Sequence, residues 1–239
     1  MLLELPCLDQ MEEGYFPDTD CALPYPNGLL AWGGTLSSRR LVSAYRSGIF
    51  PWYSKGEPIL WWSPSPRCVL ETEEVYISSR TRRRLRQGAF QFTSDVAFEA
   101  VIEGCAMPDT GRESTWISDD MKVAYIQMYH DGIAHSVETW MEGQLVGGIY
   151  GLSIGKMFFG ESMFSLVPDA SKTALIMLCR QLNDWGFELI DCQVGNPHLL
   201  RMGAKEIERV EFEARLKIAV EQHHPDDFWK QGINTGRDW

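Results

Sequence analysis

Three consecutive strand-length segments joined by short glycine-containing turns constrain the fold of this chain more than any other feature. Residues 135–141, 145–153 and 156–164 are mainly apolar or β-branched. Glu142-Gly143 separates the first two segments, and Ile154-Gly155 separates the second two. A glycine at this place is typical of a tight β-hairpin. The sequence therefore predicts an antiparallel meander from 135 to 164.

Helical periodicity surrounds this meander on both sides. Helices are expected over 38–47, 78–87, 95–105, 170–185 and 211–220, with a further helix capped by Ser118; two more strands are expected at 90–94 and 188–193. Helices that cover one antiparallel sheet give the α+β class. We expect a small N-terminal α/β domain over 1–66 and a second, mainly antiparallel domain over 67–239, divided at the proline-rich SPSPR segment.

Two carboxylates lie inside segments with the composition of buried strands. Glu161 stands between a glycine and a serine after two phenylalanines, and Asp191 follows a leucine and an isoleucine. A buried ionised carboxylate is unfavourable unless it is paired or hydrogen-bonded. Two interpretations stay open: each acid caps backbone or pairs with an arginine, or together they form a site that needs negative charge away from water.

Strand alternation suggests where these side chains point. Asp191 and Gln193 share one face of the 188–193 strand, because alternate residues of a strand lie on the same side. If this strand lies beside the last strand of the meander, Glu161 can face the same space. The pattern predicts a site built from two acids and a glutamine.

One basic segment stands out in an acidic chain. The net charge is −11, which by itself argues against nucleic acid as a partner. Residues 80–86 nevertheless carry five arginines. Salt confines the reach of each charge to about 10 Å at ~0.1 M, so a local stripe can still meet a phosphate backbone. A solvated helix face and a phosphate-binding face both remain open.

Composition also excludes several classes of protein. None of the six cysteines forms a CxxC pair, and the five histidines show no HExxH spacing, so we expect reduced thiols, no metal site and no cofactor. No apolar run approaches the ~18 residues of a membrane span, and the N-terminal stretch lacks the basic start of a secretory signal. These features predict a cytoplasmic protein with no membrane partner.

Several motifs occur together and in a fixed order. They are PNGLLAWGGTLSSRRLVSAYRSGIFPWYSKGEPILWWSPSPRCVL, TWISDDM, AHSVETW, LVGGIYG, FFGESMFS, ASKTAL and LIDCQVGNPHLLRMGA. Over residues 16–212 the chain closely resembles the leucyl/phenylalanyl-tRNA–protein transferase family. The resemblance implies a small N-terminal domain followed by a GNAT-like acyltransferase domain.

The same resemblance implies an activity and its partners. Members of the family move Leu or Phe, and Met less well, from aminoacyl-tRNA to the N-terminal α-amine of proteins that begin with Arg or Lys. The product is marked for N-degron proteolysis in the bacterial cytoplasm. The resemblance implies Leu-tRNA and Phe-tRNA as donors, a protein or peptide as acceptor, no cofactor, and a monomer.

The resemblance also carries functional residues onto this sequence. Catalytic roles fall on Asp191, Gln193 and Glu161; contacts with the donor on Trp52, Trp116, Phe158, Met163, Ser165 and Ile190; contacts with tRNA on Arg80, Arg82, Arg83, Arg84 and Arg86. Simple alternation places Phe158 and Met163 on opposite faces of their strand, so lining one pocket with both requires a β-bulge or a mixed lining.

The implied chemistry is the attack of an amine on an activated ester. We expect Asp191, acting through Gln193, to orient the amine and accept its proton, and Glu161 to hold an ammonium or a cationic side chain.

Two other classes of function remain possible. An acetyl-CoA-dependent acetyltransferase needs a glycine-rich turn before a helix, whereas residues 166–171 contain no glycine. A non-catalytic reader of tRNA or of basic N-termini would tolerate loss of Asp191 and Gln193.

Overall fold

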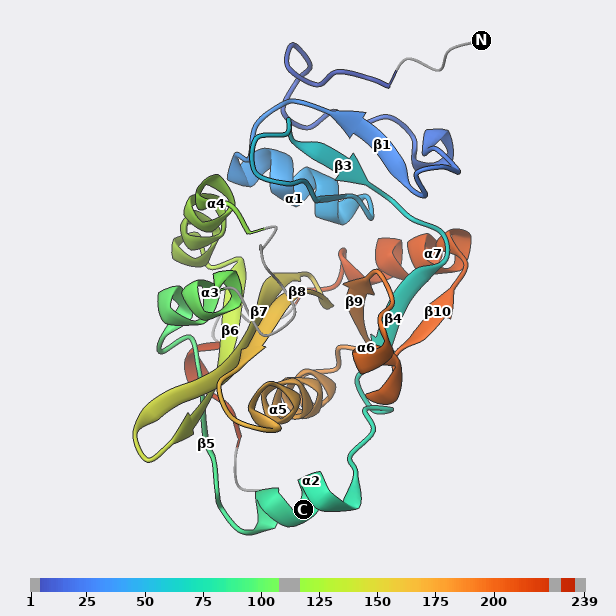
Figure 1. Ribbon diagram of the computed structural model, residues 1–239. Helices are drawn as coiled ribbons and strands as arrows, with labels where there is room; N and C mark the ends of the chain where they lie inside the picture. The colour runs from blue at the N-terminus through green and yellow to red at the C-terminus, as the bar shows by residue number, and fades with distance from the viewer. Residues whose placement is uncertain (1–4, 108–116, 224–228, 235–239) are drawn as a thin grey trace.

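The structure is a computed structural model that describes residues 5–107, 117–223 and 229–234 (Figure 1). A small sheet with one helix lies against one end of a larger sheet that carries helices on both faces (Figure 1). This arrangement confirms the α+β class, with a small N-terminal unit and a mainly antiparallel C-terminal sheet.

The described strands form two sheets. The smaller has the order β1-β3-β2 and the larger the order β10-β4-β9-β8-β7-β6-β5. Neighbouring strands are antiparallel except β8 and β9, which are parallel. The strands are β1 (Leu29–Trp32), β2 (Phe50–Pro51), β3 (Leu60–Trp62), β4 (Arg67–Glu71), β5 (Gln91–Ser94), β6 (Ala134–Met141), β7 (Gln144–Ile154), β8 (Met157–Ser165), β9 (Leu189–Gln193) and β10 (Lys205–Ile207).

The expected helices form close to their predicted bounds. Ser37, Ser78 and Ser118 each accept a hydrogen bond from a backbone N–H in the first turn of the helix that follows. The cap at Ser118 was predicted from the sequence. The short helix α6 was not expected. The helices are α1 (Ser38–Arg46), α2 (Ser79–Arg86), α3 (Phe98–Ala106), α4 (Asp119–His130), α5 (Ala170–Asp184), α6 (Pro197–Arg201) and α7 (Arg209–Ala219), with 3₁₀ turns η1 (Thr19–Cys21) and η2 (Trp229–Gln231).

The predicted meander is confirmed as β6, β7 and β8. Glu142 and Gly143 both have positive φ, 52° and 77°, as a type I′ hairpin turn requires. The second turn differs slightly from the prediction, because β7 includes Ile154 and the turn therefore contains Gly155 and Lys156.

A β-bulge interrupts β8 at Glu161. Tyr150 pairs with Ser162 and the next residue of β7 pairs with Gly160, so Glu161 is left without a partner in the ladder. The extra residue reverses the alternation beyond it. Phe158 and Met163 consequently belong to the same hydrophobic cluster, on the α5 side of the sheet. Of the two alternatives that the sequence left open, a β-bulge or a mixed lining, the β-bulge is therefore present.

Two helical layers cover the larger sheet. Gly147 and Gly148 in the middle of β7 face opposite sides: a Cβ on Gly147 would meet Ala170 of α5, whereas one on Gly148 would meet Val101 of α3. α5 therefore packs on one face, and α3 with α4 packs on the other. The cluster on the α3 and α4 side continues into the small sheet and α1.

The SPSPR segment joins the two sheets. It follows β3 of the small sheet and leads into β4 of the large one. Because one hydrophobic cluster runs across this junction, the division into domains 1–66 and 67–239 stays a prediction. Among the described residues, no helix combines the length and apolar character that crossing a membrane requires.

Candidate active site

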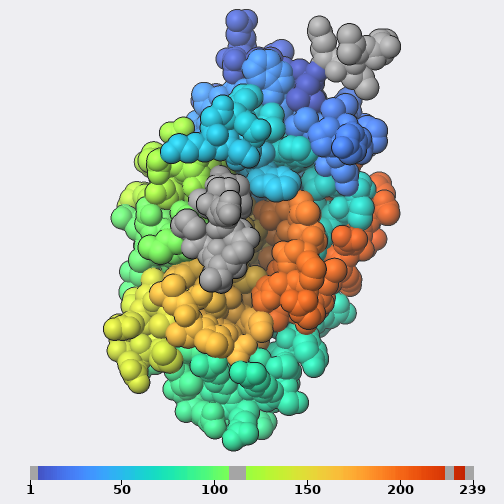
Figure 2. Space-filling view, in the orientation of Figure 1, coloured from blue at the N-terminus to red at the C-terminus, as the bar shows by residue number. Residues whose placement is uncertain are grey.

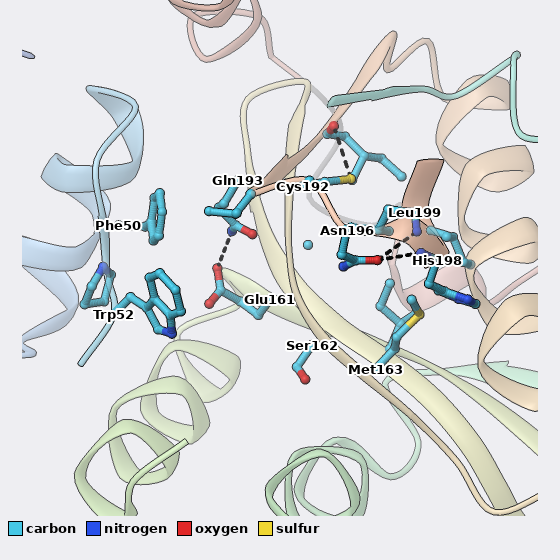
Figure 3. Close-up of a pocket in the computed structure, with 17 residues that line it drawn as sticks. Phe50, Trp52, Glu161, Ser162, Met163, Cys192, Gln193, Asn196, His198 and Leu199 are labelled. Atoms are coloured by element: carbon cyan, nitrogen blue, oxygen red, sulfur yellow. Dashed lines mark hydrogen bonds between the residues drawn. The ribbon is translucent and has the colours of Figure 1, made fainter. Parts of the chain in front are cut away.

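A pocket of about 410 Å³ lies between the ends of β8 and β9 (Figures 2 and 3). The two strands pair only from Met157 to Phe159 and from Leu189 to Asp191, and the pocket occupies the space beyond this pairing. One part of its wall is apolar: Ile149, Met163, Leu175, Ile190 and Leu199. Another part is polar: Glu161, Ser162, Gln193, Asn196 and His198. The small sheet supplies Phe50, Pro51 and Trp52.

Glu161 is the carboxylate of this pocket. Its Oε1 accepts hydrogen bonds from the Tyr45 hydroxyl at 2.7 Å and from Gln193 Nε2 at 3.1 Å. Its Oε2 accepts one from the Tyr125 hydroxyl at 3.0 Å. Tyr45 and Tyr125 are fully buried and also contact each other through their hydroxyls. Figure 3 shows Glu161 and Gln193 between the aromatic side chains Phe50 and Trp52 and the side chains of α6.

The surroundings of Glu161 hold its carboxyl near the point of half-protonation at neutral pH. Burial raises the pKa of Glu161 to about 7, because desolvation disfavours the charged form. Hydrogen bonds from Tyr45 and Tyr125 oppose this rise, the charge of Asp191 adds to it, and Arg67 opposes it. The pKa values of both tyrosines lie well above their ordinary value, chiefly because of burial, so their hydroxyls stay neutral donors.

Asp191 is placed differently from Glu161. Its side chain is completely buried and accepts two hydrogen bonds from Arg67, from Nε at 2.8 Å and from Nη2 at 2.7 Å. The Arg67 guanidinium lies between the rings of Phe50 and Phe212, at 4.8 and 4.6 Å. Phe50 also lines the pocket, whereas Arg67 and Asp191 do not. The two acids do not share one cavity.

Gln193 connects the buried ion pair to the pocket. A second bulge leaves Cys192 unpaired against β4 and gives Gln193 a φ of 55°, in the left-handed region. The backbone N–H of Gln193 donates to Asp191 Oδ1 at 2.9 Å, while its side chain reaches Glu161. Asp191 therefore acts on the pocket by fixing the backbone that carries Gln193.

This geometry corrects the expectation from strand alternation. Asp191 and Gln193 do not face the same space, because the bulge and the positive φ of Gln193 turn its side chain out of the regular pleat. Asp191 lines no part of the pocket. The structural interpretation, pairing with an arginine, holds for Asp191, whereas Glu161 and Gln193 meet at the pocket as expected.

The residues expected to contact the donor divide into two groups. Met163 and Ile190 line the apolar wall. Phe158 is fully buried in the cluster beneath it, and Ser165 lies outside the pocket, where its hydroxyl accepts from the backbone N–H of Ser171 at the start of α5 at 2.8 Å. Neither Phe158 nor Ser165 is therefore part of the pocket lining.

Of the two tryptophans that were expected to contact the donor, the structure describes only Trp52. Trp52 lines the pocket and is 44% exposed, and its backbone carbonyl accepts from Trp62 Nε1 at 2.6 Å. An exposed indole at a pocket mouth is suited to stacking on a base. Trp116 lies outside the described residues.

The basic helix forms as predicted and is exposed. Arg80, Arg82, Arg83 and Arg86 are exposed on α2. Arg84 is half-buried: it donates to the Pro168 carbonyl at 2.8 Å, and its guanidinium lies 4.9 Å from the centre of the Phe90 ring. Arg84 therefore attaches α2 to the loop that precedes α5.

Sequence interpretation missed Tyr45, Tyr125 and Arg67. Tyr45 and Tyr125 occupy apolar positions of α1 and α4, and Arg67 ends the SPSPR junction. A buried tyrosine usually finds a polar partner, and a buried arginine needs an acid. Those rules indicate that partners exist, but no local pattern identifies them.

No group of three or more histidine, cysteine, aspartate or glutamate residues within the described segments could hold a metal ion. The pocket contains one acid, one glutamine and mostly apolar side chains. This set of side chains is suited to binding an organic substrate.

The chain is similar in sequence to one family over most of its length. A family model described as leucyl/phenylalanyl-tRNA protein transferase matches residues 69–217, and a model of the N-terminal domain of that family matches residues 34–65. The leucyl/phenylalanyl-tRNA–protein transferase of Thiobacillus denitrificans is 53% identical over 90% of this chain and 94% of its own length. The one from Hahella chejuensis is 50% identical over 96% of this chain and 98% of its own length.

Matches among solved structures are distant. A GCN5-related N-acetyltransferase from Kribbella flavida has a TM-score of 0.38 and 10% identity, covering 69% of this chain and 59% of that one. The structure of L-PGS from Bacillus licheniformis has a TM-score of 0.35 and 10% identity, covering 70% of this chain and 54% of that one. These similarities carry no argument about function.

Proposed function

The chain belongs to the leucyl/phenylalanyl-tRNA–protein transferase family, and we propose that it transfers leucine or phenylalanine, and methionine less well, from aminoacyl-tRNA to proteins that begin with arginine or lysine. The acceptor is the α-amine of that first residue. The product carries a new apolar N-terminus that marks it for N-degron proteolysis. The proposed setting is the cytoplasm, and the proposed active form is a monomer without a cofactor.

One observation carries this proposal: Gln193 and Glu161 are hydrogen-bonded between an apolar wall and an exposed tryptophan. An aminoacyl ester needs an apolar site for its side chain and polar groups at its reacting carbon. The pocket supplies both within one cavity. The ester is activated, so its attack by an amine needs no ATP.

The apolar wall supports leucine and phenylalanine as donors. Met163, Leu175 and Ile190 surround the part of the pocket on the α5 side. A pocket of this kind separates side chains that differ by one methylene by only ~10–200-fold. The pocket should therefore accept several side chains that are not branched at Cβ. The β-branched side chains of valine and isoleucine fit less well.

Glu161 is suited to receive the proton of the attacking amine. The α-amino group has a pKa of about 7.7–8.0, so a minor share of it is neutral at pH 7 and able to attack the ester. As the C–N bond forms, the nitrogen gives up a proton, and a carboxylate with a pKa of about 7 is well matched to accept it. When the C–O bond of the ester breaks, the protonated carboxyl can return this proton to the ribose oxygen, which leaves as the hydroxyl of the tRNA. In this proposal Gln193 orients the amine, and Asp191 is a positioning residue whose charge Arg67 already balances.

Acidic groups near the pocket support a basic acceptor. Glu161 lies inside it, and the carboxylate of Glu206 lies against Gly195 of the lining, so close that a Cβ there would be 2.7 Å from Oε1. A cationic Arg or Lys side chain would find favourable charge at this edge. The exposed arginines of α2 would contact the phosphate backbone of the tRNA.

The deciding experiment is single-turnover transfer from leucyl-tRNA to a short peptide that begins with arginine, followed by mass spectrometry. The expected product is the peptide extended by one leucine. Matched peptides beginning with lysine, alanine and aspartate test the acceptor, and valyl-tRNA tests the donor. Equal transfer to all four peptides would contradict the proposed preference for Arg and Lys at the acceptor N-terminus. Absence of product would contradict the proposed transfer activity.

A further inference from the structure

Two cationic side chains, Lys172 and Arg201, and the imidazole of His198 lie at the α6 end of the pocket, across from Trp52. His198 lines the pocket, and Arg201 follows it by one helical turn on α6. Lys172 lies on α5, one turn before the pocket residue Leu175. The charges of Lys172 and Arg201 both act on His198 and lower its pKa, after the larger effect of burial. The three side chains therefore share one small region.

Lys172 is joined to the basic helix α2 through one acid. Asp169 Oδ1 accepts from Lys172 Nζ at 3.1 Å, and its Oδ2 lies 3.5 Å from Arg84 Nη1 of α2. The Asp169 side chain is only 10% exposed. Its negative charge is therefore largely balanced by Lys172 and Arg84. Asp169 thus links Lys172 of α5 to Arg84 of α2, and the electrostatic effect of Lys172 extends to His198 of the pocket. We call the set Arg84, Lys172, His198 and Arg201 the basic track.

The track lies on the face of the molecule that carries the pocket. In Figure 2, the golden and orange surfaces around residues 165–175 and 195–205 adjoin above the green surface of α2. Arg201 is exposed and makes no hydrogen bond or ion pair within the described part of the chain. Clustered cations repel one another, so an uncompensated arginine in a chain of net charge −11 indicates a place for an anion.

We propose that Arg201, supported by Lys172 and His198, binds a backbone phosphate of the single-stranded 3′ end of the donor tRNA. This inference rests on the proposed function and adds to it a contact that joins the reacting ester to the tRNA body held by α2. Arginine presents a planar set of donors that fits two phosphate oxygens. The contact positions the donor and takes no part in the chemistry.

Two aminoacyl donors, one with phosphates and one without, distinguish a phosphate contact of Arg201 from its other possible contacts. Leucyl-tRNA carries the phosphates, whereas 3′-O-leucyl-adenosine offers the same ester and base without any phosphate. Each is used with the same arginine-initiated peptide and with four proteins: the wild type, Arg201→Ala, Arg201→Glu, and Lys217→Ala as a control. Lys217 is exposed on α7 and outside the pocket lining, and its removal changes the net charge by the same amount as Arg201→Ala.

For leucyl-tRNA, we expect Arg201→Ala to lower kcat/KM by roughly three- to tenfold, the scale of one exposed charge-assisted contact, and Arg201→Glu to lower it further. For leucyl-adenosine, both variants should match the wild type, which also shows that they are folded. The dependence of log affinity for tRNA on log salt should become shallower by roughly 0.7, the value for one phosphate on a single strand.

Other results overturn the inference. Equal losses with both donors would place Arg201 in acceptor binding or in the fold, and no loss with leucyl-tRNA relative to Lys217→Ala would show that it contacts no phosphate. Failure of the proposed function is distinct from either, because then the wild type would transfer leucine from neither donor.

Discussion

Arg67 and Asp191 form a fully buried bidentate ion pair that lies behind the pocket wall. Phe50 contacts the guanidinium and also lines the pocket, and Gln193 is hydrogen-bonded both to Asp191 and to Glu161. Asp191 is therefore structural in its direct contacts. The acid with the unusual pKa is the one that faces the pocket.

This ion pair predicts strong coupling between its two members. Arg67→Met or Asp191→Leu alone should lower the free energy of unfolding by roughly 3–5 kcal/mol, because each leaves a buried charge unpaired. The double variant should lose clearly less than the sum, as a denaturation-based double-mutant cycle would show. Additive losses would contradict the pairing. Removing the exposed Arg46–Glu221 pair is the matched control and should change stability far less.

Asp191→Ala also predicts a loss of function by release of Gln193. Transfer should fall severely while tRNA binding persists, because the backbone N–H of Gln193 loses its acceptor but α2 is untouched. Single-turnover transfer and a tRNA-binding titration on the same preparation measure both effects. A variant that transfers leucine at the wild-type rate would eliminate Asp191 as a positioning residue.

Glu161 predicts a characteristic pH profile. If its ionised form accepts the proton of the amine, transfer should rise with pH through about 7, the pKa of Glu161. Below that value two deprotonations are required, one at Glu161 and one at the amine, so log rate should rise with a slope near two. Glu161→Gln should be slower and keep only the inflection of the amine, near ~7.7–8.0. An unchanged slope in this variant would show that Glu161 carries no proton.

The same pKa shift predicts the pH dependence of stability. The folded-state pKa of Glu161 is raised from 4.5 to about 7, so the fold favours the protonated form. Stability from this source is fully present below pH 4.5 and is lost as pH rises towards 7. Glu161→Gln should therefore be more stable than the wild type at pH 8, by on the order of 1–3 kcal/mol, and not at pH 4. Thermal unfolding at both pH values provides the measurement.

The two buried tyrosines predict the direction of a further shift. Their hydrogen bonds lower the pKa of Glu161, so Tyr45→Phe and Tyr125→Phe should each raise it and move the inflection of the pH–rate profile upward. Tyr129→Phe is a suitable control, because its hydroxyl donates to the Asp95 carbonyl, outside the pocket lining. A downward shift in the Tyr45 or Tyr125 variant would contradict the hydrogen-bond pattern.

Much of the fold could be predicted from local pattern. The meander β6-β7-β8, the serine-capped helices and the basic helix α2 all form close to the expected residues. Periodicity and capping depend on side chains a few positions apart, so they can be recognised in the sequence. The short helix α6 escaped because it is only five residues long.

The candidate site was predicted only in part. The sequence indicated Glu161 and Gln193. The family resemblance implied either a β-bulge between Phe158 and Met163 or a mixed lining, and the structure contains the bulge. The location of Asp191 behind the wall depends on a second bulge and on a left-handed φ at Gln193. Simple alternation cannot anticipate either, because both depend on pairing with β4.

The sequence by itself determined which helices and strands form and which charged residues could be buried away from water, because those properties follow from neighbouring side chains. Only the tertiary structure decided that Arg67 neutralises Asp191 and that Tyr45 and Tyr125 hold Glu161. These partners are separated by 124, 116 and 36 positions. The energy of a buried charge depends on whatever surrounds it in space, and that environment exists only once distant segments have packed together.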